Sequence, residues 1–156
     1  MSKSAIRSSI NHYEAKINEE YNFINKCEDE IFDLEICYKR IDNAESKHNN
    51  EQARRITVLK RFEGKNKTIK IARIYSEQMS NLIAGEENNR MVDCFEDAKR
   101  MIKKQILKLE NDIDDAKARI SNYKNKISDL RNQLAAIEAR EAREREQAAR
   151  AAQGLI

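Results

Sequence analysis

Apolar residues recur at alternating spacings of four and three in two long stretches of this chain, and each stretch keeps the pattern for about five heptads. A repeat of 3.5 residues kept this long indicates an α-helix whose apolar stripe, here called a seam, must be buried against another helix. The sequence therefore predicts an all-α fold, a long antiparallel helical hairpin or coiled coil. The first seam is formed by Ile6, Ile10, Tyr13, Ile17, Glu20, Ile24, Cys27, Ile31, Leu34, Tyr38 and Ile41. The second is formed by Ile102, Ile106, Leu109, Ile113, Ala116, Ile120, Tyr123, Ile127, Leu130, Leu134 and Ile137.

The composition agrees with helices that carry narrow seams. Charged residues make up 37% of the chain, proline and tryptophan are absent, and there are three glycines among 156 residues. This is typical of a charged helical rod, in which little apolar surface is left for a broad core. An enclosed pocket is not expected, which disfavours an enzyme. The net charge of +3 comes from 30 basic and 27 acidic residues mixed along the helices, so it does not require a nucleic-acid partner.

The best candidate for the hairpin tip lies at residues 63–67. Ser2 or Ser4 can cap the first helix, which then meets no breaker for about 60 residues, or roughly 90 Å of helix, until Gly64. Gly64 permits a positive φ, and Thr68 can cap a new helix. We expect a hairpin over residues 1–137, with a helix at 2–62, a tip at 63–67 and a helix at 68–137 interrupted near residue 85. A charged helical C-terminal extension is expected at 138–156.

Two places are predicted to depart from a regular hairpin. The heptad phase is lost after Ile41, so a bend is expected at residues 42–50, and the seam then resumes weakly. Gly85 lies in a polar segment and predicts either a kink or a turn. The resumed seam is formed by Ala53, Ile56, Leu59 and Phe62.

The two seams also predict a register. Aligning Ile6 with Ile137 places the turn between the two helices near residue 71. A turn at Gly64 instead requires each residue of the first helix to pair with a residue about a dozen positions earlier in the second. We favour a C-terminal overhang whose seam is covered by another molecule, together with an irregularity at Gly85. The register set by Gly64 would bring Cys37 and Cys94 to matching heights, so a disulfide is geometrically conceivable, while reduced thiols are the expectation in the cytoplasm.

No familiar set of catalytic or metal-binding residues occurs in the sequence. Three cysteines and two histidines have no metal-ligand spacing, and there is no glycine-rich phosphate loop and no hydrolase motif. We therefore expect no enzyme, no metal and no cofactor. No signal peptide or membrane span is recognisable, which predicts a cytoplasmic protein, exported, if at all, without a cleaved signal.

Basic residues gather around the predicted tip. Such a patch can meet nucleic acid or an acidic protein surface. Few aromatic side chains that could stack on bases lie nearby, so nucleic acid is the less favoured of these partners. The patch consists of Arg54, Arg55, Lys60, Arg61, Lys65, Lys67, Lys70 and Arg73.

The turn at Phe62, Gly64 and Lys65, set between two long helices, resembles the WxG-type helical hairpins of type VII secretion, with Phe62 in the place of the tryptophan. The chain is most similar to the small α-helical partner proteins encoded beside LXG toxins, whose turn is followed by an aromatic-bearing helix, here with Tyr75, and by isoleucine and leucine heptads. The resemblance covers about residues 1–135. Tyr38 and Asp42 also resemble the Tyr-x-x-x-Asp secretion signal of that system, although their seam position favours a packing role.

The resemblance implies a partner or chaperone that binds the N-terminal helical domain of a secreted toxin and supports its export. In that case the contact with the other helical protein would be made by the seam residues. A self-assembling coiled coil, such as a scaffold or phage component, would use the same residues, and a nucleic-acid-binding hairpin is the third possibility. The predicted partner-binding residues are Ile106, Ile113, Ile120, Ile127, Leu134, Ile10, Ile17, Ile24 and Ile31.

Overall fold

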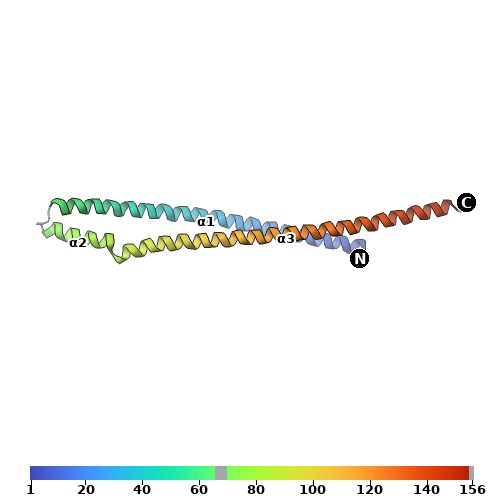
Figure 1. Ribbon diagram of the computed structural model, residues 1–156, viewed down its shortest axis with the longest axis horizontal. Helices are drawn as coiled ribbons and strands as arrows, with labels where there is room; N and C mark the ends of the chain where they lie inside the picture. Colours follow the sequence, from blue (N-terminus) through green and yellow to red (C-terminus); the bar gives the residue numbers. More distant parts are fainter. Residues whose placement is uncertain (66–69, 155–156) are drawn as a thin grey trace. The chain divides into compact units, whose positions relative to one another are not determined.

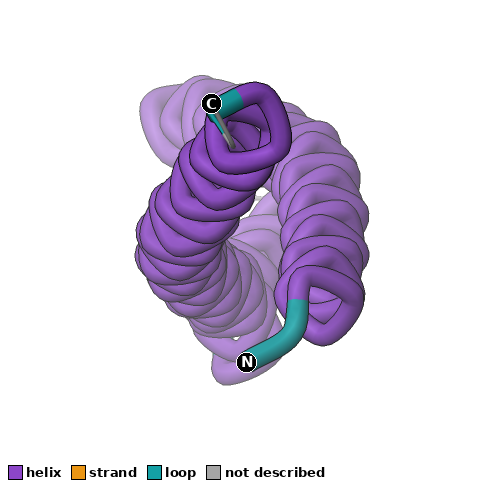
Figure 2. Tube along the Cα trace, turned by 90° about the vertical axis from the view of Figure 1, so that its right-hand side faces the viewer, coloured by secondary structure: helices purple, strands orange, loops and turns teal. Residues whose placement is uncertain are grey.

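The computed structural model describes residues 1–65 and 70–154, without the side chains of residues 62–65 and 72. It contains three helices: α1 (Lys3–Lys65), α2 (Lys70–Ala84) and α3 (Glu86–Gln153) (Figure 1). The trace of the described residues is helical almost throughout, with no strand in it (Figure 2). The all-α fold class and the helical-hairpin order are thereby confirmed. Helix α1 continues through Gly64 to Lys65, and residues 66 and 67 of the predicted tip lie outside the described residues.

Helix α1 begins at a serine cap. The Ala5 backbone amide donates a hydrogen bond to Ser2 Oγ at 3.1 Å, and the Ile6 amide donates to the Ser2 carbonyl oxygen at 3.0 Å. Of the two serines considered as caps, Ser2 therefore satisfies the first free amides of the helix. This hydroxyl is the reason why a helix with no acidic residue in its first turn can start here.

The helices form two compact units, each of which pairs part of α1 with a later segment. The terminal unit comprises Met1–Glu28 and Glu110–Ile156, and the central unit comprises Asp29–Leu109. In the terminal unit the seams of α1 and α3 bury one another, and Ile6 is fully buried. Isoleucine dominates this seam because its branched side chain fills the holes between facing helices. The buried apolar residues of the terminal unit are Ile6, Ile10, Ile17, Ile24, Cys27, Ile113, Ala116, Ile120 and Ile127.

The register of the terminal unit is the one predicted by aligning the seams. The ion pair between Arg7 and Glu138 measures 3.3 Å, and the one between Glu14 and Arg131 measures 3.2 Å. Lys3 contacts Glu141, and the exposed α3 residues after Glu141 extend past the start of α1. The favoured overhang of an uncovered second seam is therefore wrong, because α1 pairs with this seam as far as Ile137 and residues 142–154 carry no large apolar side chain.

The central unit keeps the corresponding register. Lys99 contacts Glu45 and Asp42, so residues just after Ile41 meet residues just before Ile102. This register leaves no reason for Cys37 and Cys94 to face one another, and both are exposed free thiols.

The predicted loss of phase after Ile41 is wrong. Helix α1 runs without interruption through residues 42–50, and its 4-3 spacing continues with polar side chains. Ala53 and Ile56, which were expected to carry the resumed seam, are exposed. Hydropathy misses the true phase because the residues that face α3 here are polar and have polar partners on that helix. The half-buried continuation consists of Glu45, His48, Gln52, Arg55 and Leu59.

Gly85 forms a kink, because α2 and α3 follow one another in nearly the same direction on either side of it (Figure 1). The Asn89 amide donates to the Gly85 carbonyl oxygen at 3.2 Å, which starts α3 directly. None of the glycines in the described residues has a positive φ, so Gly85 is required for another reason. A Cβ atom at Gly85 would lie 2.2 Å from the Asn81 carbonyl oxygen, a distance that only glycine avoids.

Replacing Ile120 by aspartate should strongly destabilise the terminal unit. Ile120 is 5% exposed, and an unpaired carboxylate at this place should cost about 3–5 kcal/mol in the free energy of unfolding. Urea unfolding followed by circular dichroism measures this cost. Ser121→Asp adds the same charge on the exposed side of α3 and should leave the midpoint nearly unchanged. Equal midpoints for Ile120→Asp and the wild type would contradict the seam assignment.

Gly85→Ala should lower the free energy of unfolding by roughly 1–2 kcal/mol, because the added methyl group collides with the Asn81 carbonyl oxygen. Thermal unfolding measures the effect. Gly154→Ala is the matched control, since its Cβ would lie 2.7 Å from the Arg150 carbonyl oxygen in a last turn that can open at little cost. A higher melting temperature for Gly85→Ala would mean that a straight helix is preferred and that the kink is not required.

Candidate helix-docking face

The seam residues predicted to bind a partner lie between the helices of this chain. Six of the nine are buried, namely Ile10, Ile17, Ile24, Ile113, Ile120 and Ile127. The other three, Ile31, Ile106 and Leu134, are half-buried. In this folded state the buried six are covered by the chain itself, so a partner that leaves the helix pair intact must use other side chains.

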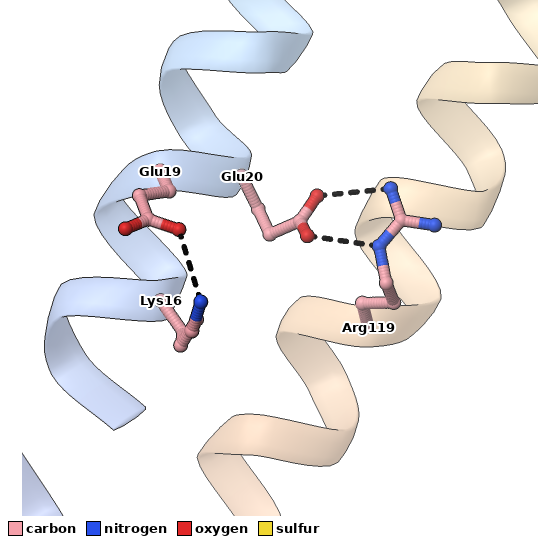
Figure 3. A network of polar contacts seen from close by, with 4 residues as sticks. All are labelled: Lys16, Glu19, Glu20 and Arg119. Atoms are coloured by element: carbon pink, nitrogen blue, oxygen red, sulfur yellow. Dashed lines mark hydrogen bonds and ion pairs between the residues drawn. The ribbon is translucent and has the colours of Figure 1, made fainter. Parts of the chain in front are cut away.

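Ion pairs line the seam of the terminal unit. Arg119 donates two hydrogen bonds to the Glu20 carboxylate, at 2.9 and 3.0 Å, while Lys16 pairs with Glu19 along α1 (Figure 3). The hydrogen bond from Arg119 explains how Glu20, the polar member of the seam, is tolerated, and it raises the pKa of Arg119. These contacts help to fix the register but add little stability where they are exposed.

The hydrogen bond from Lys3 to Glu141, at 2.6 Å, closes the start of the helix pair and lowers the pKa of Glu141 below its ordinary 4.5. A carboxylate whose pKa is lowered by folding stabilises the folded state above its unfolded pKa. This contribution is therefore present at neutral pH and is lost as the pH falls below about 4.5 and through the folded-state pKa.

Lys99 occupies a seam position of the central unit and holds a polar layer together. Its Nζ atom lies 3.0 Å from Glu45 Oε1 and 3.4 Å from Asp42 Oδ1. The hydrogen bond to Glu45 is the main cause that raises the pKa of Lys99 above 10.5. The stabilisation contributed by charged Lys99 is therefore fully present below pH 10.5 and is lost only as the pH rises through the folded-state pKa. Glu45 Oε2 is buried with no hydrogen-bond partner, so the layer is incompletely satisfied.

A second polar layer lies nearer the kink. His48 Nε2 is 2.6 Å from Asn88 Oδ1, and Gln52 Nε2 donates to the same oxygen at 2.8 Å. Gln52 Oε1 is buried without a partner. Within the described part of the central unit, Leu109 alone is a buried core residue. This unit is therefore held by fewer apolar contacts than the terminal unit.

An apolar groove opens beside the first polar layer. Its volume is about 260 Å³, and it is formed by Glu35, Tyr38, Lys39, Lys103 and Ile106, here called the Tyr38 groove. The Lys103 ammonium lies 5.4 Å from the centroid of the Tyr38 ring, a cation–π contact that keeps the ring at the edge of the seam. Tyr38 and Ile106 supply the apolar surface, and three charged residues surround it.

Two large apolar side chains extend this surface. Phe32 is 62% exposed and lies one turn before Glu35, while Leu107 is 58% exposed and lies one turn after Lys103. Both follow a seam residue directly, Ile31 and Ile106, so both fall outside the 4-3 stripe. The prediction from sequence missed them for that reason, although the adjacent apolar pairs Ile31-Phe32 and Ile106-Leu107 are a visible signal.

The remaining predicted residues have different places. Tyr38 and Asp42, the signal-like pair, both lie near Lys99. The Lys99 Nζ atom is 5.8 Å from the centroid of the Tyr38 ring and 3.4 Å from Asp42 Oδ1. Phe62 and Gly64 lie in the last turn of α1, and their side-chain surroundings are outside the described part. Among residues 1–65 and 70–154, no three metal-ligating side chains group together. None of the described helices has an apolar run that could span a membrane.

In comparisons with known proteins, no family model, curated protein or solved structure matches this chain.

The polar layer at Lys99 should respond differently to single and double replacement. Lys99→Leu leaves the buried Glu45 carboxylate without a cation and should lower the melting temperature by several degrees. The double variant Glu45→Leu with Lys99→Leu should melt at or above the wild-type temperature, because two apolar residues then pack in the seam. Lys104→Leu, on an exposed face, serves as the control. A double variant less stable than Lys99→Leu would contradict the expected coupling.

Proposed function

We propose that this protein is a non-enzymatic helical partner that binds another helical protein across the Tyr38 groove. The main support is the apolar surface formed by the groove together with Phe32 and Leu107. Two packed helices bury only their facing seams. A third helix can lie in the groove between the two helices and cover side chains just outside the seam. Exposed aromatic and aliphatic side chains around a small apolar hollow fit the ridge of an amphipathic helix.

The charges around the groove favour a defined orientation of that helix. Glu35 and Lys39 stand on α1, one turn apart on either side of Tyr38, and Lys103 stands on α3. A docking helix with an apolar ridge, a basic residue near Glu35 and acidic residues near the two lysines would complement this rim. Such pairs contribute more to orientation and specificity than to affinity.

In biological terms, we propose that the partner is the N-terminal helical domain of an LXG-type toxin of type VII secretion. The support is the resemblance carried by Gly64, Lys65 and the two heptad seams. In this role the protein would cover the apolar surface of the toxin in the cytoplasm and support its export.

The proposal is tested by co-expression with the N-terminal helical domain of an LXG-type toxin, chosen from any such gene adjacent to this one, followed by titration calorimetry of the purified proteins. We expect a defined heteromer. Leu107→Glu and Phe32→Glu should each weaken the complex tenfold or more, equivalent to about 1.4 kcal/mol, without changing the circular dichroism of the free protein.

Met101→Glu is the matched control, because Met101 is 71% exposed on α3 but lies on a different side of this helix from Lys103 and Leu107. It should bind like the wild type. Unchanged affinity of both Leu107→Glu and Phe32→Glu would exclude this face as the binding site. The proposed function would be overturned if the protein forms no complex with the toxin domain at any concentration.

A further inference from the structure

Helix α2 carries apolar residues on two different faces. Tyr75, Met79 and Ile83 are half-buried and recur every four residues, which is the face that packs within the central unit. Ile71 is 78% exposed, Ile74 is 45% exposed and Leu82 is 52% exposed. Together with Gln78, these three residues follow spacings of three, four and four along a second helix face, and they are called the α2 stripe here. A helix that exposes such a stripe in water is typical of a contact surface.

The α2 stripe leads into a groove at the Gly85 kink. Gln78, Leu82, Gly85 and Met91 line this groove, which has a volume of about 600 Å³, and Met91 is 49% exposed. The kink thus extends the apolar face of α2 onto the first turns of α3.

Charged residues of opposite sign stand at the two ends of the α2 stripe. Lys70 is exposed at the start of α2, and Glu86 and Glu87 are exposed just after the kink. Glu86 lies 3.6 Å from Arg90, but both side chains are more than three-quarters exposed, so this pair is easily exchanged for another. The face therefore carries Lys70 at one end and apolar side chains in the middle. At the other end stand Glu86 and Glu87, with Arg55 of α1 lining the same groove.

We propose that a second copy of this chain docks on the α2 stripe, with the two α2 helices antiparallel and a two-fold axis at Gln78. By residue spacing, this axis places Ile74 opposite Leu82 of the second copy, Lys70 opposite Glu86 of the second copy, and Ile71 over its Gly85 groove. Every contact then occurs twice, as an isologous interface requires. The reversal of charge along the face makes a second copy its natural complement, because an antiparallel arrangement pairs each basic end with an acidic end.

This contact goes beyond the proposed function, since it uses α2 and leaves the Tyr38 groove free. A single 15-residue helix offers less area than a standard protein interface, so the dimer should be weak and concentration-dependent. Its apolar core should hold the copies together, while the charged ends set the orientation and make the dimer sensitive to salt.

Sedimentation velocity of the full chain tests the proposal, over concentrations from about 10 μM to about 1 mM, the range in which weak interfaces assemble. The wild type should shift from the mass of one chain, 18.2 kDa, toward that of two. Ile74→Glu and Leu82→Glu should stay monomeric with unchanged circular dichroism. Leu107→Glu, beside the Tyr38 groove, should dimerise like the wild type.

A charge exchange tests the orientation. Lys70→Glu should weaken the dimer at least fivefold, and Lys70→Glu combined with Glu86→Lys should restore it, because the two ends are then reversed together. A wild type that is monomeric up to 1 mM, an Ile74→Glu variant that still dimerises, or a double variant without rescue would overturn the proposal. If Phe32→Glu and Leu107→Glu lose toxin binding but still dimerise, that result supports the proposed function and leaves the dimer proposal standing.

Discussion

Burial of the isoleucine seam between α1 and α3 is the interaction on which the rest of the structure depends. A helix of this charge has no other apolar surface wide enough to pack, and in the terminal unit isoleucines at both kinds of seam position are buried. Each seam residue contributes the free energy of removing its side chain from water, about 25 cal/mol per Å² of apolar surface. Glu20 interrupts the seam without breaking it because Arg119 reaches across from α3 and satisfies both carboxylate oxygens.

The central unit follows the same geometry with different chemistry. Glu45, His48 and Gln52 stand where the terminal unit has isoleucines, and they pair with Asn88 and Lys99. Such layers accept only the register in which their partners meet, whereas apolar seams tolerate a shift by a heptad more easily. Their cost is visible in the two buried oxygens left without partners, Glu45 Oε2 and Gln52 Oε1. We infer that polar layers specify the register of this unit at the expense of its stability.

The less apolar seam is accompanied by more exposed apolar surface. Phe32 and Leu107 stand beside the Tyr38 groove, and the α2 stripe ends at the Gly85 kink, all within the central unit. Two helices alone cannot cover these side chains, since each helix hides only the face turned to the other. The two proposals therefore place different occupants on different faces, a partner helix on the groove and a second copy on α2.

A 3.5-residue repeat of isoleucine predicts the fold class and both seams, because it leaves few ways to bury the apolar side chains. Aligning the seams also predicts the register that the structure has, whereas the register expected from a tip at Gly64 is wrong. The sequence also indicates an irregularity at Gly85, but whether the chain kinks or turns there is seen only in the structure, where α3 starts directly after Gly85. Hydropathy could not follow the seam beyond Ile41, because a glutamate or histidine is recognised as a seam residue only when its partner on the opposite helix is known. Exposure was decided in the same way: Ile120 and Leu107 are similar residues thirteen positions apart on one helix, yet α1 covers the first and leaves the second in solvent. Only the tertiary structure decides which side chains the opposite helix covers, and therefore which ones remain available to a partner.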